Sequence, residues 1–205
     1  MARTREFEPE TVLDAALDLF WRKGYKACSM ADVVRHSGVA RYGLYQAFKD
    51  KDQLYCAALK RYQQKIHDHF VKPFSGQRAS YQSLVEHFDR VLDQLENGEH
   101  QGCFAHQAAI ERGGKSADVD KIIQCIFDNS RKSFRTVIEN AIADGDIRPL
   151  PADELVTYVM GIQRAITATT KQNCALEERQ NYGRCALALM KPRPYFSNTF
   201  SEYAF

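Results

Sequence analysis

The sequence predicts an all-α protein in which an N-terminal domain of three helices precedes a larger helical domain. Apolar residues recur at helical spacing along most of the 205 residues, and hydrophobic residues make up 44% of the chain, enough for a sizeable core. The six prolines stand near the ends of the periodic segments. No alternating run bounded by turns predicts a strand, and the sequence has no internal repeat.

The first predicted helix begins at Pro9, because proline suits a first helical position, where no N–H partner is needed. Its buried side follows the spacing of Val12, Ala16 and Phe20. Gly24 is expected to end it in the left-handed conformation, which glycine adopts without steric cost.

Two short helices are expected next. Ser29 and Asp32 have the spacing of a capping box, so the second helix is predicted to begin there and to end at Gly38. The third is predicted over residues 41–48. Two helices joined by a tight turn that contains glycine, here residues 37–40, form a helix-turn-helix unit.

Longer helices are predicted after this unit. The fourth starts at Asp50 and reaches about Phe70, where Pro73 and Gly76 are expected to break it. The others span residues 80–95, 103–112, 117–143, 152–174 and 176–190, and residues 191–205 form an irregular tail rich in aromatics.

Charge is spread unevenly along the chain. Residues 1–65 contain twelve Lys and Arg against eight Asp and Glu, a net charge of +4. The remaining residues contain sixteen against eighteen, a net charge of −2. This asymmetry predicts an anionic partner for the first part only.

The third helix carries side chains that suit DNA recognition. A helix this short is marginal alone, and insertion into the major groove gives its outer face a use. Arg41, Tyr42 and Gln46 are expected to point outward, and Gly43 leaves room for close approach of the backbone. Arg pairs bidentately with guanine, and Gln pairs with adenine. The alternative is that these are solvated polar residues of a small helical domain.

A second group of residues is expected to contact the DNA backbone. Tyr45, Lys49 and Lys51 are placed for phosphates, which position a protein without reading sequence. Ser29 and Met30 open the preceding helix, whose N-terminal amides favour a phosphate through the helix dipole.

Residues 15–54 resemble the TetR family of bacterial transcriptional regulators. The shared features are a glycine-aromatic pair, a Ser that opens the second helix, a Gly-Val turn, a Leu-Tyr pair before Phe, and a Lys-x-Lys. In this chain they are Gly24-Tyr25, Ser29, Gly38-Val39, Leu44-Tyr45, Phe48, and Lys49 with Lys51. Many members have Gly where this chain has Tyr42 and Thr or Ser where it has Gly43, which leaves the order of base contacts open.

The resemblance implies an all-α homodimer. Its helix-turn-helix domain, residues 1–52, would bind a palindromic double-stranded DNA operator, and residues 53–190 would bind a small-molecule effector and dimerise through the last two helices. The residues agree, since 157–170 and 185–190 are rich in apolar side chains, with Ile166 central. Packing within one chain would explain these segments equally well.

The larger domain has candidates for an effector pocket. Aromatic positions at helical spacing are more often core than ligand site, yet a mostly apolar cavity with a few polar groups suits a small-molecule sensor. The candidates are Phe88, Cys103, Phe104, His106, Gln107, Phe127, Tyr158 and Gln163, with His87, Phe134 and Met160 beside them.

Cys103 has two interpretations. It lies near the predicted start of a helix, which lowers the pKa of a thiol, so it is either sensitive to electrophiles and oxidants or a small packing residue. With His106 three residues on, an enzyme with a helical pocket and a cysteine nucleophile is the alternative function. No oxyanion or orienting motif accompanies the pair.

The remaining features bound the class of protein. The six cysteines include no CxxC pair, which predicts reduced thiols and neither a metal site nor a cofactor. No apolar stretch is long enough to span a membrane, and the first residues do not form a secretory signal. We expect a cytoplasmic, ligand-responsive repressor that is not an enzyme; an activator or a nucleoid-type protein is a minor alternative.

Overall fold

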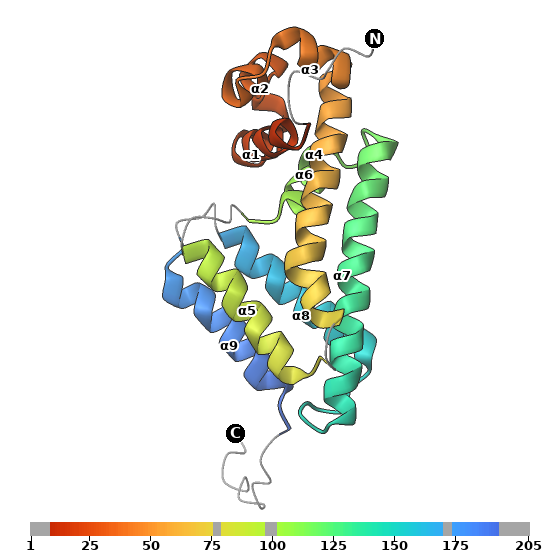
Figure 1. Ribbon diagram of the computed structural model, residues 1–205. Helices are drawn as coiled ribbons and strands as arrows, with labels where there is room; N and C mark the ends of the chain where they lie inside the picture. The colour runs from red at the N-terminus through yellow and green to blue at the C-terminus, as the bar shows by residue number, and fades with distance from the viewer. Residues whose placement is uncertain (1–8, 76–78, 97–101, 170–173, 193–205) are drawn as a thin grey trace, which may run out of the picture.

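The computed structural model describes residues 9–75, 79–96, 102–169 and 174–192, and within these ranges it contains helices and turns but no strand. The all-α prediction is confirmed. Three helices, α1 (Pro9–Ala27) and the much shorter α2 (Met30–Ser37) and α3 (Arg41–Ala47), gather at one end of α4 (Lys51–Ile66), as Figure 1 shows. We call α1, α2 and α3 the helix-turn-helix end.

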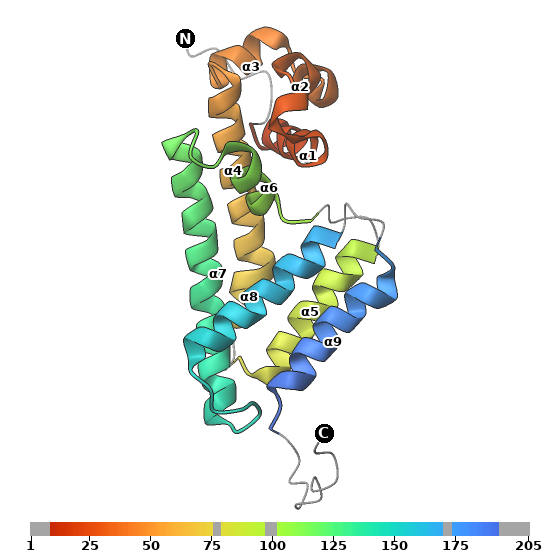
Figure 2. The ribbon, with the colours of Figure 1, turned by 180° about the vertical axis from the view of Figure 1, so that it is seen from behind.

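The longer helices build the rest of the molecule. The longest, α7 (Ala117–Ala143), packs beside α4, while α5 (Tyr81–Glu96), α8 (Ala152–Ala168) and α9 (Leu176–Met190) form the far end. The short α6 (Phe104–Arg112) contacts both α1 and α7. It lies between the two ends, which the reverse view in Figure 2 shows clearly.

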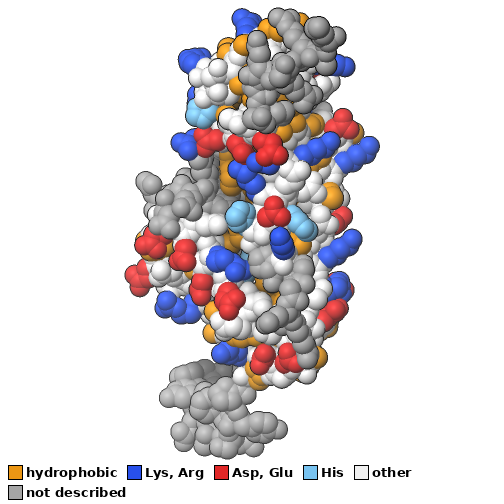
Figure 3. Space-filling view, viewed as in Figure 1, with side chains coloured by type: hydrophobic (Ala, Val, Ile, Leu, Met, Phe, Trp, Pro, Cys, Tyr) orange, Lys and Arg blue, Asp and Glu red, His pale blue; other side chains and the backbone are white. Residues whose placement is uncertain are grey.

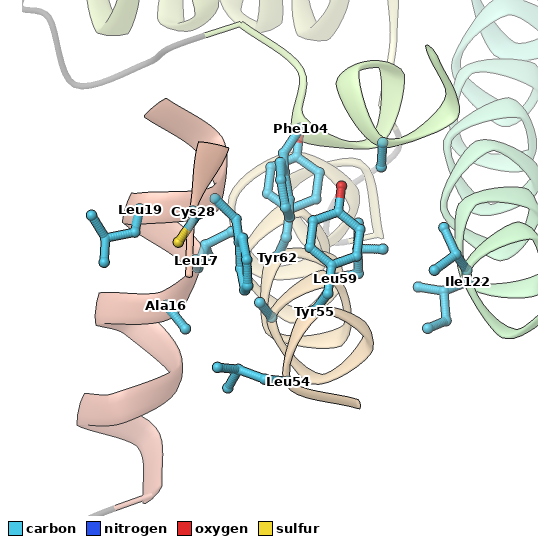
Figure 4. Packing of buried hydrophobic residues seen from close by; sticks show 14 of the residues in the cluster. Ala16, Leu17, Leu19, Cys28, Leu54, Tyr55, Leu59, Tyr62, Phe104 and Ile122 are labelled. Atoms are coloured by element: carbon cyan, nitrogen blue, oxygen red, sulfur yellow. The ribbon is translucent and has the colours of Figure 1, made fainter. Parts of the chain in front are cut away.

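Two hydrophobic cores hold the two ends. The first joins α1 to α4, α6 and the N-terminal half of α7, and the second joins α5, α8 and α9 to the C-terminal half of α7. Figure 4 shows the first core, where side chains of α1 such as Leu17 face Tyr55 and Tyr62 of α4 and Phe104 of α6. Ile66 packs against both cores, so the end of α4 marks the seam between them.

Local signals explain the short helices. The Ser29 hydroxyl accepts a hydrogen bond from the Asp32 N–H (3.1 Å), and the Asp32 carboxylate accepts one from the Ser29 N–H (2.8 Å), so the predicted capping box is present. Gly38 ends α2 in the left-handed conformation, with φ 70° and ψ 5°. Asp50 caps α4 by accepting from the Gln53 N–H at 2.8 Å.

Three predicted helix ends need correction. Gly24 interrupts α1, but its φ of 80° and ψ of 166° fall outside the left-handed helical region, in a part of backbone space that essentially only glycine adopts. The α-helical part of α4 ends at Ile66 and continues as a π-helical turn, His67–Val71, followed by a 3-10 turn, Lys72–Ser75, that includes Pro73.

The eighth helix is shorter than the sequence pattern predicted. It ends at Ala168, with Thr169 as its cap, whereas residues 152–174 were expected to be helical. Residues 170–173 lie outside the described part of the chain, as does most of the predicted aromatic tail, residues 193–205.

Candidate functional site

The burial of one face of α3 determines which of its side chains point outward. Leu44 is fully buried against α1 and α2, and this fixes the rotation of the helix. Arg41, Tyr42 and Gln46 are exposed as predicted, and 71% of the Tyr42 side chain is accessible although it is aromatic. The Arg41 guanidinium lies 5.6 Å from the centre of the Tyr45 ring, which orients it along the helix.

The residues predicted to contact phosphates lie in different surroundings. Tyr45 and Lys49 are exposed, whereas the Lys51 ammonium lies 4.1 Å from the centre of the Tyr25 ring and faces the base of the helix-turn-helix end. The Met30 side chain is buried, and Ser29 is engaged by Asp32. A phosphate at the start of α2 would therefore meet the Asp32 carboxylate.

Charge is arranged to match this face. In Figure 3, Lys and Arg side chains stand around the helix-turn-helix end, while a group of acidic side chains lies nearer the middle of the molecule. Some of the acidic groups are neutralised, since Arg61 binds Asp14 through two hydrogen bonds of 3.0 Å. The hydrogen bond from Arg61 lowers the pKa of Asp14. At the helix-turn-helix end, Arg22 and Arg35 are likewise paired, with Asp18 and Asp32, whereas Arg41 and Lys49 are exposed.

A second feature is a cavity of about 60 Å³ at the seam between the two cores. Its wall comes from α4 and the π turn, α5, α6, α7 and α8, and is mainly apolar. The lining residues are Tyr62, Ile66, Phe70, Val71, Phe74, His87, Val91, Cys103, His106, Ile126, Phe127, Ser130, Ser133, Phe134, Met160, Gln163, Arg164 and Thr167.

The structure brings together half of the predicted effector residues. Cys103, His106, Phe127 and Gln163 line the cavity, as do His87, Phe134 and Met160. The other four lie elsewhere: Phe88 packs toward Gly183 of α9, Phe104 is fully buried in the first core, Tyr158 packs on the second core, and Gln107 donates to the Phe20 carbonyl at 3.2 Å. Helical spacing gave no means to distinguish these two groups.

Burial reverses the pKa shift that was expected for Cys103. Desolvation raises the pKa of its thiol, and this outweighs the Tyr62 hydroxyl, which donates to the sulfur at 3.5 Å, and the backbone N–H groups of His106 and Ala105. The helix N-terminus thus acts in the expected direction but is the weaker effect. The residue as a whole stays partly accessible, and it is one of the residues that line the cavity.

Both histidines of the cavity are neutral at ordinary pH. Desolvation lowers the pKa of His87 to about 3 and that of His106 to about 4, with nearby Arg90 and Arg164, respectively, acting in the same direction. The His106 ring lies against Phe127, with ring centres 4.7 Å apart. A neutral imidazole offers one donor and one acceptor nitrogen.

The far end of α6 is bound to the helix-turn-helix end. The Glu111 carboxylate accepts a hydrogen bond from the Tyr25 N–H at 2.6 Å, and a Cβ atom added to Gly24 would overlap that carboxylate. Gln107 joins the same carboxylate at 3.2 Å. The unusual backbone of Gly24 therefore makes room for Glu111.

A second contact ties α6 to the start of α4. Arg112 donates to the Asp52 carboxylate at 2.8 Å, and its guanidinium lies 4.2 Å from the centre of the Tyr25 ring. The Tyr25 hydroxyl donates to the same Asp52. The nine residues of α6 thus contact the cavity at one end, through Cys103 and His106, and the helix-turn-helix end at the other.

The sequence analysis missed several of these residues. Tyr62, Ile66 and Phe70 line the cavity at intervals of four residues, a stripe that continues past the part of α4 packed on α1. This apolar stripe is visible in the sequence and could have identified these three residues as part of the cavity wall. Glu111 and Arg112 gave no such signal, because a charged pair at the end of a helix is usually solvated.

Among the described residues, no group of His, Cys, Asp and Glu side chains is arranged to hold a metal ion. In the same ranges, no helix is long and apolar enough to cross a membrane.

Comparison with known proteins gives consistent matches. The family model described as bacterial regulatory proteins, tetR family, matches residues 12–58, and that described as tetracyclin repressor-like, C-terminal domain, matches residues 81–180. The HTH-type transcriptional repressor ComR of Escherichia coli (strain K12) is 23% identical over 190 residues, which cover 91% of this chain and 90% of ComR.

Solved structures share the fold. A cysteine mutant of the TetR family transcriptional regulator CifR, complexed with 26-base-pair operator DNA, matches with a TM-score of 0.80 and 24% identity, over 92% of this chain and 100% of that one. A TetR transcriptional regulator from Chloroflexus aurantiacus matches with a TM-score of 0.76 and 22% identity, over 87% of this chain and 91% of that one.

Proposed function

Because the chain belongs to the TetR family of bacterial regulatory proteins, we propose that it is a homodimeric transcriptional repressor which a small molecule releases from a palindromic DNA operator. The outward face of α3 is the main support, since it presents Arg41, Tyr42 and Gln46 to solvent on a helix held from behind by Leu44. ComR is an HTH-type transcriptional repressor, and the CifR cysteine mutant of the same fold is complexed with operator DNA.

We assign the DNA contacts by side-chain chemistry. Arg41 and Gln46 read bases, with Tyr42 and the small Gly43 beside them, and Tyr45 and Lys49 contact phosphates. Lys51, Ser29 and Met30 are also proposed to contact the DNA backbone. They can use only groups that are not already engaged, because Lys51 lies over the Tyr25 ring, the Ser29 hydroxyl is bonded to Asp32 and the Met30 side chain is buried. This DNA-binding domain is assigned to residues 1–52, and the effector and dimerisation domain to residues 53–190.

Release from DNA would pass through α6. A ligand in the cavity presses on Cys103 and His106, while Glu111 and Arg112 at the other end hold Gly24, Tyr25 and Asp52. The two recognition helices of a dimer must match grooves about 34–36 Å apart, so a small rotation of each helix-turn-helix end is sufficient to lose the operator. The ligand drives this only by binding better to the rotated state.

The dimer is proposed to form through α8 and α9. Ile166, expected at the centre of this interface, is fully buried within the single chain and cannot face a partner. The exposed apolar stripe is instead Tyr182, Cys185 and Leu189 of α9, spaced at three and four residues, with 62% of Leu189 accessible.

A covalent effector is the second candidate, because Cys103 is among the residues that line the cavity. An electrophile small enough to enter the cavity would add to the thiolate and leave bulk between packed helices. The raised pKa of this thiol makes the reaction slow at neutral pH. The same raised pKa is the reason to propose that the protein is not a cysteine-nucleophile enzyme. The reduced thiols agree with a cytoplasmic location.

Gel-shift titration with DNA from upstream of the protein's own gene tests the function. We expect sequence-specific binding that weakens as salt rises, and about 1–3 kcal/mol lower affinity for Arg41→Ala. Lys49→Ala, the matched control, should weaken binding to all DNA alike and reduce the salt slope by about one. Equal binding to unrelated DNA would indicate a nucleoid-type protein, and absence of binding would favour the enzyme.

Light scattering tests the dimer assignment. Leu189→Asp should yield folded monomers, because a charge would be buried in the interface. Leu150→Asp replaces another exposed leucine, away from α8 and α9, and should leave the dimer intact. A folded dimer for Leu189→Asp would refute the assignment of this stripe.

A further inference from the structure

His87 is a polar side chain in apolar surroundings. Only 1% of it is exposed, and it lines the cavity from α5. The rings of Phe70, Phe74, Phe88 and Phe134 surround it, with ring centres between 5.2 and 5.6 Å from its own. Among the residues that the structure describes, neither imidazole nitrogen has a hydrogen-bond partner. Such an unpaired buried group is costly, and it is retained where a ligand supplies the missing partner.

The neighbouring Gln163 does not fill this role. Its side chain approaches His87 as a weak hydrogen-bond partner and so opposes the fall in the pKa of this imidazole, but the contact does not meet the distance and angle of a hydrogen bond. The imidazole therefore keeps one N–H donor and one acceptor nitrogen unpaired, on a residue that lines the cavity. Because the ring is neutral at ordinary pH, it offers hydrogen bonds without a charge.

The charge of the wall limits the charge of the ligand. No Asp or Glu occurs among the described residues that line the cavity, so a cationic ligand would lack a counter-ion. Arg164 could face an anion, but it is exposed, and its guanidinium lies over the Phe127 ring, 5.4 Å from the ring centre. A carboxylate placed against His87 would lose its water among phenyl rings. The surroundings of His87 therefore favour an uncharged ligand.

The size of the cavity links binding to movement. Its volume of about 60 Å³ is well below the roughly 150 Å³ of an engineered apolar cavity that binds benzene. A ring-sized ligand can enter only if the wall moves. The wall includes Cys103 and His106 of α6, so the ligand binds better to a state in which α6 is displaced.

We propose that the effector is an uncharged, ring-sized molecule with one hydroxyl or carbonyl group, and that His87 forms the hydrogen bond which selects it. This inference deepens the proposed function and rests on it. A hydroxyl group can donate to the acceptor nitrogen of His87, and a carbonyl group can accept from its N–H. Phe70 and Phe134 supply the apolar contact to the ring.

Four probes of similar size test the ligand class: toluene, benzyl alcohol, benzoate and benzylammonium. Trp21, the single tryptophan of the chain, lies edge-on to the cavity residue Tyr62, with ring centres 5.2 Å apart, so its fluorescence reports binding, with calorimetry as a second readout. We expect benzyl alcohol to bind about tenfold more tightly than toluene, and the two ions to bind more weakly than either. Tighter binding of an ion, equal binding of toluene, or no saturable binding of benzyl alcohol would overturn the proposal.

His87→Phe tests the residue. The variant keeps an aromatic ring in the same place and should lose the preference for benzyl alcohol over toluene. Tyr158→Phe is the matched control, because it removes a hydroxyl from an aromatic side chain outside the cavity, and it should keep the preference. A folded His87→Phe protein that still prefers benzyl alcohol would rule His87 out. If that variant does not fold, the ranking of the four probes on the native protein decides.

Operator binding by the native protein without any probe tests the proposed function separately. If the protein binds its operator specifically but the probes do not rank as expected, only the proposed class of effector is refuted, and the proposed function stands. Specific binding together with release of the operator by benzyl alcohol, at concentrations that saturate the Trp21 signal, is the result expected when both hold.

Discussion

The helix-turn-helix end and the cavity differ in the range of the contacts that build them. In α2, Ser29 and Asp32 are three residues apart and cap the helix, and Gly38 ends it through its own backbone. The cavity wall brings together five helices, with His87 from α5, Cys103 from α6 and Met160 from α8. The first region is therefore specified residue by residue, whereas the second exists only when two cores meet.

This difference suggests how a regulator can change its ligand and keep its DNA-binding module. Substitutions in the cavity wall leave the caps and the buried Leu44 untouched, so α3 keeps its outward face. The two regions must still communicate, and the contacts of α6 with Gly24, Tyr25 and Asp52 are where they do so. Substitutions can therefore be directed at the helix-turn-helix end, at the cavity, or at the α6 contacts that link the two.

The largest effect is expected for Phe104→Ala, at the junction of α1, α4 and α6. Phe104 is fully buried, with ring centres 5.5 Å from Tyr55, 5.7 Å from Tyr62 and 6.2 Å from Trp21. Its loss should lower the free energy of unfolding by about 3–5 kcal/mol in a urea titration. Tyr42→Ala, the exposed control, should change it by no more than about 0.5 kcal/mol. A stable Phe104→Ala protein that loses its ligand response would mean that Phe104 contacts the ligand, as the sequence predicted.

The next effect concerns the link itself. Gly24→Ala and Gly145→Ala both force a positive φ, 80° and 76°, on alanine, which costs about 1–3 kcal/mol. Only at Gly24 does the new Cβ also overlap Glu111; the described surroundings of Gly145 are empty within 4 Å. We expect Gly24→Ala to lose a further 1.5–3 kcal/mol, roughly the value of the hydrogen bond from Tyr25 to the Glu111 carboxylate. Equal losses in both variants, measured by urea titration, would mean that Glu111 does not hold α1.

Lowering the pH should destabilise the cavity before it affects the charged groups of the helix-turn-helix end. The unfolded His87 imidazole protonates near its ordinary pKa of 6.5, whereas in the fold its pKa is lowered to about 3. Below pH 6.5 protonation therefore favours the unfolded chain, and the free energy of unfolding should fall by up to about 1.4 kcal/mol per pH unit. The lowered pKa of His106 acts in the same direction. Asp14 loses its stabilising charge only below its ordinary pKa of 3.8.

Urea titrations from pH 7 down to pH 4.5 measure this slope. His87→Phe should remove about half of it, because a phenyl ring takes up no proton and His106 still contributes its own share. His36→Phe is the control, since His36 is an exposed histidine of the helix-turn-helix end. An unchanged slope in His87→Phe would show that this imidazole is not buried and neutral in solution.

The same contrast in range explains what could be predicted from the sequence. The capping box, the glycine that ends α2 and the outward positions Arg41 and Gln46 depend on neighbours three or four residues away, and the structure has them as predicted. Phe104 and Phe127 have the same helical spacing, yet one packs in a core and the other lines the cavity. Which of these occurs depends on the helix that each faces, and spacing along one helix does not contain that information.

The pKa of Cys103 and the backbone conformation of Gly24 could not be predicted from the sequence for the same reason. The sequence placed Cys103 correctly at the start of a helix, but the desolvation that raises the pKa of its thiol comes from residues of other helices. Gly24 was expected to end a helix, whereas its conformation serves Glu111, which lies 87 positions later in the chain. Long-range partners of this kind appear only when the tertiary packing is known.

The smallest effect expected is that of Ser29→Ala, and it tests the local side of the comparison. The Ser29 hydroxyl is an acceptor for the Asp32 N–H, so its removal should lower the free energy of unfolding by about 1 kcal/mol in the same urea titration. Ser116→Ala is the matched control: Ser116 caps α7, but its hydroxyl is 3.5 Å from the Val119 N, and valine cannot return a hydrogen bond as Asp32 does. The control should therefore lose less. Because the cap is local, Ser29→Ala should leave the affinity of benzyl alcohol for the cavity unchanged. A loss of ligand affinity in this variant would mean that the two regions are coupled through α2 as well as α6.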